Sequence, residues 1–271
     1  MATIQALNIY PVKSCRGIAV DTATVTPMGF HRDREWLIVD TNYRFITQRE
    51  EPRLALIVPS LTREALELAA PGRGPLRVGL DEEGESVEVV IWKDRCAAFD
   101  LGTAASAWLS EHLGKPVRLV RFDRRRKRVS SREWTGDIEA LTRFADAFPW
   151  LVISQASLDD LNARLPEALP MNRFRPNIVL GDVSPYAEDR AHELQAGNVV
   201  LRIVKPCTRC AIPTTDQETA ERKSDQPLRA LKAYRFDRKL KGVLFGQNAI
   251  LIAGSGETLQ VGQKMQVSWK S

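Results

Sequence analysis

The chain has 271 residues, of which 44% are hydrophobic and 27% charged, and its formal net charge is +5. This length and composition are typical of a soluble globular protein with one large or two modest domains. No stretch approaches the ~18 uninterrupted apolar residues of a membrane helix, and the first residues lack the pattern of a leader. We therefore expect a cytoplasmic protein without a membrane partner. The 4 cysteines are too few for a secreted disulfide framework.

Short segments with alternating apolar residues dominate the chain, and they have the β-branched content of half-buried strands. In chain order, we predict strands within residues 3–11, 18–26, 34–40, 44–47, 87–92, 116–122, 150–154, 176–180, 198–204, 249–253 and 265–269. Many strands with isolated helices favour barrels or curved sheets over repeated βαβ units. The predicted fold class is therefore mixed, β-rich α+β.

Three segments have helical spacing. Residues 103–114 end in a glycine, residues 157–165 open with a Ser157 capping signal, and residues 225–234 offer Asp225 as the cap and Pro227 in the first turn. Leu158, Leu161 and Leu165, and then Leu228 and Leu231, are expected to face inward.

The positive charge is concentrated in residues 121–132, where seven cations and Asp123 give +6, which leaves −1 for the rest of the chain. The interpretation we favour for this segment is a solvated mobile loop. The second is a docking site for an acidic partner protein, and the last is a binding site for nucleic acid or an anionic membrane. No interleaved aromatic residues support nucleic acid as a partner. The arginine-rich residues 121–145 are also the predicted boundary between two domains, 1–125 and 126–271.

The segment VKPCTRCAIPTTD, residues 204–216, holds Cys207 and Cys210 at a spacing found in metal and redox sites. Structural zinc needs four ligands, and Cys15 and Cys96 are distant. A redox dithiol usually opens a helix, which the following Ala-Ile-Pro does not favour. Inert buried cysteines are a third possibility. A single thiolate that binds a soft metal, with the other cysteine structural, is the interpretation we favour.

Nine segments in series resemble one known family: YPVKSCRG (10–17), HRDREW (31–36), TQREEPRLA (47–55), NRFRPNIVL (172–180), YAED (186–189), PCTRC (206–210), TTD (214–216), PLRALKAYR (227–235) and FGQN (245–248). Through these segments the chain resembles the MOSC proteins. The most similar branch contains the YcbX-type proteins and the mitochondrial amidoxime-reducing component. The resemblance implies an N-terminal β-barrel-like MOSC domain in residues 1–125 and a MOSC β-barrel with a few helices in residues 126–271.

The resemblance also implies a molybdenum–molybdopterin cofactor, with Cys210 as the protein ligand of the metal and the catalytic residue. Cys207 corresponds to no ligand. The phosphate tail of a pterin needs cations, and its ring needs amides or peptide groups. The cofactor contacts implied by the resemblance are Lys13, Ser14, Arg34, Ala147, Phe148, Arg175, Asn177, Thr208, Arg209, Cys210 and Asn248.

The implied activity is the reduction of small N-hydroxylated compounds, such as hydroxylamines, amidoximes and N-hydroxylated bases, at molybdenum. No ferredoxin-type cysteine cluster follows the MOSC-like region, so we expect a separate electron donor of the flavin reductase or ferredoxin type, docking on residues 121–132. No nucleic acid is expected as a partner. The alternative is a sulfur carrier or cofactor-handling protein that passes on a persulfide from Cys207 or Cys210.

Overall fold

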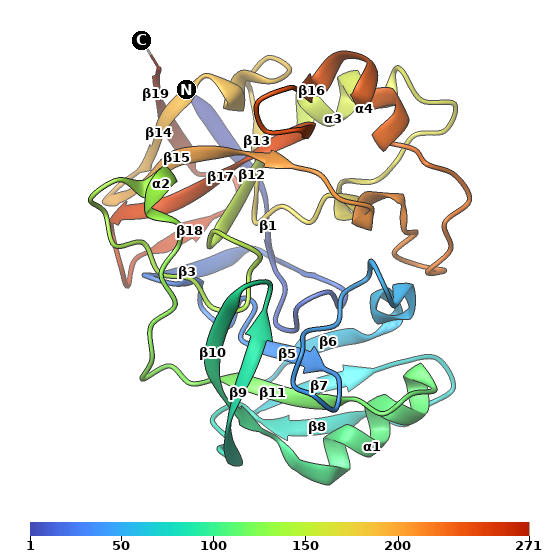
Figure 1. Ribbon diagram of the computed structural model, residues 1–271. Helices are drawn as coiled ribbons and strands as arrows, with labels where there is room; N and C mark the ends of the chain where they lie inside the picture. Colours follow the sequence, from blue (N-terminus) through green and yellow to red (C-terminus); the bar gives the residue numbers. More distant parts are fainter. Residues whose placement is uncertain (271) are drawn as a thin grey trace.

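The computed structural model describes residues 1–270, with 40% of the chain in strands and 17% in helices. Two units are visible in Figure 1: a barrel in the upper half, where both termini lie, and a smaller unit with three-stranded and four-stranded sheets and helix α1 in the lower half. The predicted β-rich α+β fold class is confirmed.

The barrel is a closed ring of 7 strands. In ring order these are β12 (Trp150–Ser154), β13 (Ile178–Gly181), β1 (Ala2–Ile9), β19 (Lys264–Trp269), β14 (Ala191–Ala196), β15 (Val199–Thr208) and β17 (Gly242–Ala253). The pairing of β12 with β17 closes the ring, and β12 and β13 run parallel. Closure leaves no unpaired edge among these seven strands. Short strands extend the ring: β2 (Ile18–Val20) pairs with β1, and β16 (Phe236–Asp237) pairs with β17.

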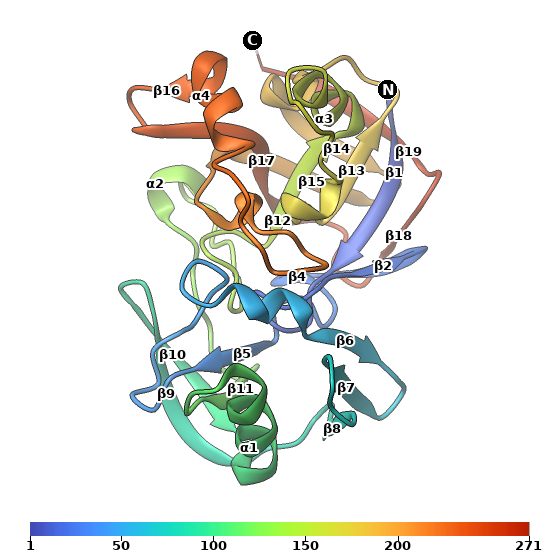
Figure 2. The same cartoon turned by 90° about the vertical axis from the view of Figure 1, so that its right-hand side faces the viewer.

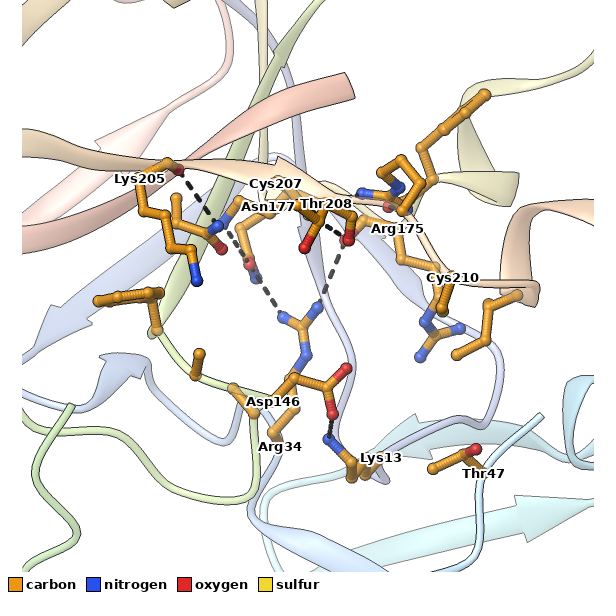
Figure 3. Close-up of a pocket in the computed structure, with 18 of the residues that line it drawn as sticks. Lys13, Arg34, Thr47, Asp146, Arg175, Asn177, Lys205, Cys207, Thr208 and Cys210 are labelled. Carbon is orange, nitrogen blue, oxygen red and sulfur yellow. Dashed lines mark hydrogen bonds and ion pairs between the residues drawn. The ribbon is translucent and has the colours of Figure 1, made fainter. Parts of the chain in front are cut away.

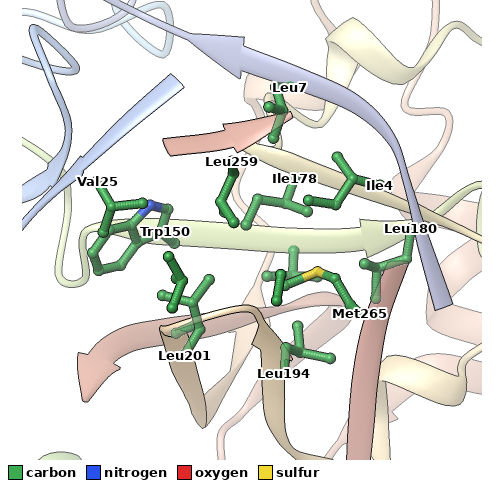
Figure 4. Close-up of a cluster of buried hydrophobic side chains, with 14 of the residues drawn as sticks. Ile4, Leu7, Val25, Trp150, Ile178, Leu180, Leu194, Leu201, Leu259 and Met265 are labelled. Atoms are coloured by element: carbon green, nitrogen blue, oxygen red, sulfur yellow. The ribbon is translucent and has the colours of Figure 1, made fainter. Parts of the chain in front are cut away.

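The barrel interior is filled by apolar side chains from the first 30 residues and from residues 150–265 (Figure 4). In β1 the register shifts between Ile4 and Ala6, so Ile4 and Leu7 both point into the core although they are three positions apart. Trp150 closes one side of the core, edge to face with Phe30 at 6.2 Å between ring centroids. A sheet of β18 (Thr258–Gln260), β3 (Thr22–Thr26) and β4 (Gly29–Phe30) covers this side.

The smaller unit packs two sheets against one helix. The four-stranded sheet has the order β5 (Trp36–Val39), β11 (Arg118–Phe122), β10 (Asp94–Asp100) and β9 (Glu85–Ile91), and the three-stranded sheet is β6 (Val58–Leu61), β7 (Ala65–Ala69) and β8 (Leu76–Gly79). Helix α1 (Gly102–Leu113) and the 3-10 helix η1 (Pro52–Leu56) bury Leu109 and Leu54 in the same core. Gly114 ends α1 in the left-handed conformation, as predicted.

The other helices correct two predicted caps. Helix α3 (Gln155–Asn162) is capped by Ser154, whose hydroxyl accepts a hydrogen bond from the Ser157 amide at 3.1 Å. The helix begins earlier than predicted because β12 runs directly into it. Helix α4 (Leu228–Arg235) has no side-chain cap from Asp225, although Leu231 is fully buried as expected. The remaining helical segments are α2 (Arg132–Thr135), η2 (Met171–Arg173), η3 (Ala187–Asp189) and η4 (Ile212–Thr214).

One predicted strand is wrong: residues 44–47 form only isolated bridges, through Arg44 and Phe45. The predicted domain boundary at residue 125 stays a prediction. The structure adds that β1 lies in the barrel, between β13 and β19, so the first strand of the chain folds with the last. None of the helices in the part of the chain described is both long enough and apolar enough to cross a membrane.

The two units are joined by a buried pair of amides. The Gln48 side chain donates to Gln217 Oε1 at 3.0 Å, and the Gln217 side chain donates back to Gln48 Oε1 at 3.0 Å. Figure 2 shows the loop after β15 descending toward the segment that leads into η1, where this contact lies. The two side chains are buried, so the two hydrogen bonds fix one unit against the other.

The arginine-rich stretch is only partly solvated. Arg121 and Arg128 are buried, whereas its other five cations are exposed, so the first interpretation holds for part of the stretch. Six of its seven cations have carboxylates within 4.0 Å: Arg121 contacts Glu35 and Glu83, Arg124 contacts Glu35 and Asp81, Arg125 contacts Asp123 and Glu83, Lys127 and Arg132 contact Glu139, and Arg128 contacts Asp94. Only Arg126 lacks such a partner among residues 1–270. These ion pairs leave little unpaired charge for an acidic partner, which weakens the predicted docking of a donor here.

Candidate active site

A cavity with a volume of about 200 Å³, open to solvent, lies between the barrel and the smaller unit (Figure 3). Its floor comes from the loop after β1 and its roof from the end of β15 and from β17. The structure brings every predicted site residue to this cavity: Lys13, Ser14, Arg34, Ala147, Phe148, Arg175, Asn177, Thr208, Arg209, Cys210 and Asn248. Their roles toward a cofactor remain a prediction.

Three of the lining residues have a left-handed backbone conformation. The φ angles are 68° at Ser14, 46° at Arg34 and 59° at Arg175. A residue with a side chain adopts this conformation at a cost of roughly 1–3 kcal/mol, and such residues gather at binding sites. Three of the ten non-glycine residues with positive φ in residues 1–270 thus lie around this one cavity.

Arg34 holds the two sides of the cavity together. Its guanidinium donates to Asp33 at 2.5 Å, to Asn177 Oδ1 at 2.9 Å and to the Arg175 carbonyl at 3.3 Å, and it lies 4.2 Å from the Tyr10 ring centroid. The Asn177 amide group also donates to the Asn8 carbonyl at 3.1 Å. The Asn177 side chain is thus engaged within the protein, and it fixes Arg34 as well as lining the cavity.

Arg175 is a buried cation without a carboxylate. Its exposed fraction is 9%, and no acidic side chain among the described residues forms an ion pair with it. The guanidinium lies 4.3 Å from the Tyr10 ring centroid, on the ring that Arg34 also contacts. Burial lowers the pKa of Arg175 to about 10. A buried arginine in this state lacks an anion, and an anionic ligand in the cavity would supply it.

Lys13 has an acidic partner on the opposite side of the cavity mouth. Its ammonium group lies 2.6 Å from Asp146 Oδ1, as Figure 3 shows. Burial lowers the pKa of Lys13 to about 8. Burial by itself would raise the pKa of Asp146, but Lys13 and then Arg49 hold it well below its usual range. The ammonium group is thus mostly charged at neutral pH but loses its proton at a lower pH than an ordinary lysine does.

The loop that carries Ala147 and Phe148 is positioned by one arginine of the basic stretch. Arg128 donates to the carbonyls of Arg143 at 2.8 Å and Ala145 at 2.5 Å, while its other nitrogens bind Asp94 at 2.9 and 3.0 Å. A planar guanidinium can satisfy these partners at once, which an ammonium group cannot. The basic stretch therefore supports the cavity from behind.

The two cysteines have separate environments at the end of β15. Cys210 Sγ accepts a hydrogen bond from Arg49 at 3.5 Å, and Cys207 Sγ accepts one from Arg209 at 3.2 Å. Both are free thiols that line the cavity and are half-buried. Each sulfur thus has a guanidinium donor of its own.

The alternatives of zinc and of a dithiol fit the geometry less well. Within residues 1–270 no group of three or more His, Cys, Asp or Glu side chains is placed to hold a metal, so the protein offers no four-ligand zinc site. Cys207 lies within β15, and the short 3-10 helix η4 follows Cys210, so neither thiol opens an α-helix.

The residues that line the cavity fit a pterin with a phosphate tail. Besides the unpaired Arg175, the buried Nε of Arg209 has no hydrogen-bond partner among the described residues. Lys205 and Asn248 add a cation and an amide to the roof, where the Asn248 amide group donates to the Lys205 carbonyl at 3.2 Å. A soft thiol, a cation without a carboxylate and the side-chain and peptide amides that line the cavity together are the donor set that such a cofactor needs.

Sequence reasoning missed several residues of the cavity. Asp146, Thr47 and Lys205 line it, and Arg49 touches the Cys210 sulfur. Thr47 and Arg49 lie inside TQREEPRLA (47–55), one of the nine segments that resemble the family, so this segment could have indicated both residues.

Comparisons with known proteins agree with this architecture. Residues 1–116 match the model of the MOSC N-terminal beta barrel domain, and residues 140–266 match that of the MOSC domain. The chain therefore belongs to the MOSC proteins.

Its relatives include mitochondrial amidoxime-reducing components. The chain is 36% identical to component 1 of Homo sapiens over 272 residues, covering 93% of this chain and 79% of the relative, and 35% identical to component 1 of Mus musculus over 270 residues, covering 91% and 75%. It is 30% identical to the molybdenum cofactor sulfurase of Bos taurus over 285 residues, covering 97% of this chain but 32% of the relative.

Proposed function

We propose that the protein is a molybdenum-cofactor-dependent oxidoreductase that reduces small N-hydroxylated compounds with electrons from a separate donor protein. The observation that carries the proposal is the cavity itself, in which the Cys210 thiol and the unpaired Arg175 line the same space. The relatives named as amidoxime-reducing components support the substrate class, and the MOSC domain supports the cofactor.

In this proposal, Arg175 and Arg209 bind the anionic tail of the cofactor, and the peptide groups of Ala147 and Phe148 face its ring. Cys210 is the protein ligand of the metal, and Arg49 keeps its sulfur directed into the cavity. When bound, the cofactor supplies two-electron transfer and an open coordination position. The substrate N–O bond breaks, two electrons and two protons are consumed, and the oxygen leaves as water.

The test is reduction of benzamidoxime with a reconstituted donor, by wild type, Cys210→Ser and Cys207→Ser, after molybdenum analysis of protein from a cofactor-competent host. We expect stoichiometric molybdenum in wild type, loss of activity in Cys210→Ser and retention in Cys207→Ser. Absence of molybdenum would argue strongly against the proposal. Equal activity in all three proteins would refute the ligand assignment, and loss in Cys207→Ser alone would move it to the other sulfur.

The similarity to a molybdenum cofactor sulfurase supports a second candidate function, the transfer of sulfur. If the protein instead carries sulfur, a persulfide should be labelled at Cys207 or Cys210, and no reduction of benzamidoxime should occur.

A further inference from the structure

The hairpin between β9 and β10 ends in a tryptophan that hairpin stability does not explain. Trp92 occupies the first position of the two-residue turn with φ 56°, and 50% of it is exposed. Turns with positive φ favour glycine, asparagine or aspartate, and a large side chain there costs roughly 1–3 kcal/mol. Burial does not offset this cost, because half of the ring faces solvent. The contacts of the indole with its neighbours supply another reason for its position.

Those contacts join Trp92 to the candidate active site. One face of the indole lies over the Arg49 guanidinium, 4.4 Å from the ring centroid, and the same guanidinium donates to the Cys210 sulfur at 3.5 Å. The indole Nε1 donates to Asp146 at 3.4 Å, and the Phe45 ring packs edge to face at 5.0 Å between centroids. A single guanidinium therefore separates the Trp92 ring from the thiol proposed to hold the metal.

Trp92 also lines a second, open groove. Its apolar wall includes Phe45 and Trp92. Its charged rim contains two carboxylates and three cations: Asp40, Glu50, Arg44, Lys93 and Lys115. Because both signs of charge are present, the rim does not select strongly for a cation or an anion. An aromatic wall with a mixed rim suits a neutral, flat molecule.

The groove adjoins the cofactor cavity along one short segment. Phe45 and Ile46 line the groove, whereas Thr47 lines the cavity, and Asp146 of the cavity is bonded to Trp92. A flat molecule lying on the Trp92 ring can therefore extend one end past Arg49 toward Cys210. This arrangement is what a substrate needs if only its terminal N–O group reacts.

From these contacts we propose that Trp92 is the platform of a substrate subsite, on which the aromatic ring of a neutral, planar N-hydroxylated substrate stacks. The proposal rests on the proposed function and adds the specificity: aromatic amidoximes and N-hydroxylated bases are preferred over aliphatic ones. Trp92 does not touch the reacting atoms in this arrangement. The left-handed backbone conformation of Trp92 places its ring beside Arg49, which accounts for the strained turn.

The experiment compares Trp92→Gly with Trp92→Phe in the holoprotein, using benzamidoxime and acetamidoxime, which share the reacting group but differ in the aromatic ring. Trp92→Gly removes the ring and also relieves the turn, so its thermal unfolding midpoint should be equal to or above that of wild type. We expect its KM for benzamidoxime to rise about tenfold, equivalent to about 1.4 kcal/mol, as the loss of an aromatic stack predicts. The KM for acetamidoxime should change less than twofold, and Trp92→Phe should lie between.

Binding without turnover separates this proposal from the proposed function. Titration calorimetry of benzamidoxime into holoprotein without a donor should show the same tenfold weakening in Trp92→Gly. If wild type binds benzamidoxime in this way but reduces neither compound, the proposed function fails and the subsite stands. Unchanged benzamidoxime binding in Trp92→Gly, or an equal loss for both compounds, would overturn the subsite. A lower kcat for both compounds with unchanged binding would assign Trp92 to electron delivery and also overturn it.

Discussion

Replacing Arg175 with methionine should stabilise the protein in the absence of cofactor. Methionine has a similar length, no charge and the same backbone constraint at φ 59°, so the change isolates the buried guanidinium. In the wild type this cation has no carboxylate among residues 1–270 and lies at a 9% exposed position. Removing it relieves a desolvation cost without leaving a buried carboxylate unpaired.

The magnitude follows from the lowered pKa of Arg175, which burial brings to about 10. The depression from an ordinary arginine corresponds to roughly 3 kcal/mol at ~1.36 kcal/mol per pH unit. Because the folded state disfavours the charged form, this penalty is fully present at neutral pH and fades as pH rises above about 10. Loss of the contact with the Tyr10 ring offsets roughly 1–2 kcal/mol. We expect a net gain of about 1–2 kcal/mol.

The assay is thermal unfolding of apoprotein made in a host that lacks the cofactor, with and without inorganic phosphate. A gain of this size should raise the midpoint by about 2–6 °C, and added phosphate should raise the midpoint of wild type but not that of Arg175→Met. In a cofactor-competent host the variant should retain little molybdenum. Destabilisation of the apoprotein by more than about 1 kcal/mol would refute the reasoning, because it would mean that Arg175 is already satisfied within the protein.

Three further predictions concern the surroundings of the cavity. Because burial lowers the pKa of Lys13 to about 8, its positive charge is lost above that pH. Retention of an anionic cofactor, measured by the release of molybdenum, should therefore fall as pH rises through 8. Release that does not depend on pH would contradict this. Gln217→Leu should cost roughly 1–3 kcal/mol in denaturant unfolding, because Gln48 Oε1 loses its hydrogen-bond donor while Gln48 Nε2 keeps only the Ser14 carbonyl, whereas adding Gln48→Leu should recover part of the loss. Arg128→Lys should lower the free energy of unfolding by roughly 2–4 kcal/mol, because it breaks hydrogen bonds to two carbonyls and a carboxylate. The control Arg126→Lys should change it by no more than about 0.5 kcal/mol. Equal effects of the two substitutions would exclude a special role for Arg128.

The predictable part of the fold was the part with a strong local pattern. Strands such as β12 and β15 have β-branched, period-2 sequences, and α1 has a helical pattern and a terminal glycine. Strand β14 was missed because its sequence AHELQA consists mostly of helix formers. It is a strand because β15 and β19 pair with it on both sides, which is tertiary information that no local pattern contains.

The candidate site divides in a similar way. The nine matched segments carried every residue that was predicted to line the cavity, except Ala147 and Phe148. The partner of Lys13 could not be read from the chain, because Asp146 is 133 positions away. The charge of residues 121–132 was misleading for the same reason: the neutralising carboxylates, such as Glu35 and Asp81, come from distant segments.

The place of β1 in the barrel constrains how the chain can fold. During synthesis, the first strand emerges long before β19 and β17, so the ring cannot close until nearly the whole chain has been made. Until then the apolar face of β1, with Ile4 and Leu7, has no barrel to enter. Removing the first few residues would therefore destabilise the barrel, which is built mostly from the C-terminal half of the chain, more than the smaller unit. A circular permutant that joins the two termini, which both lie at the barrel in Figure 1, should assemble β1 and β19 as neighbours in the sequence as well.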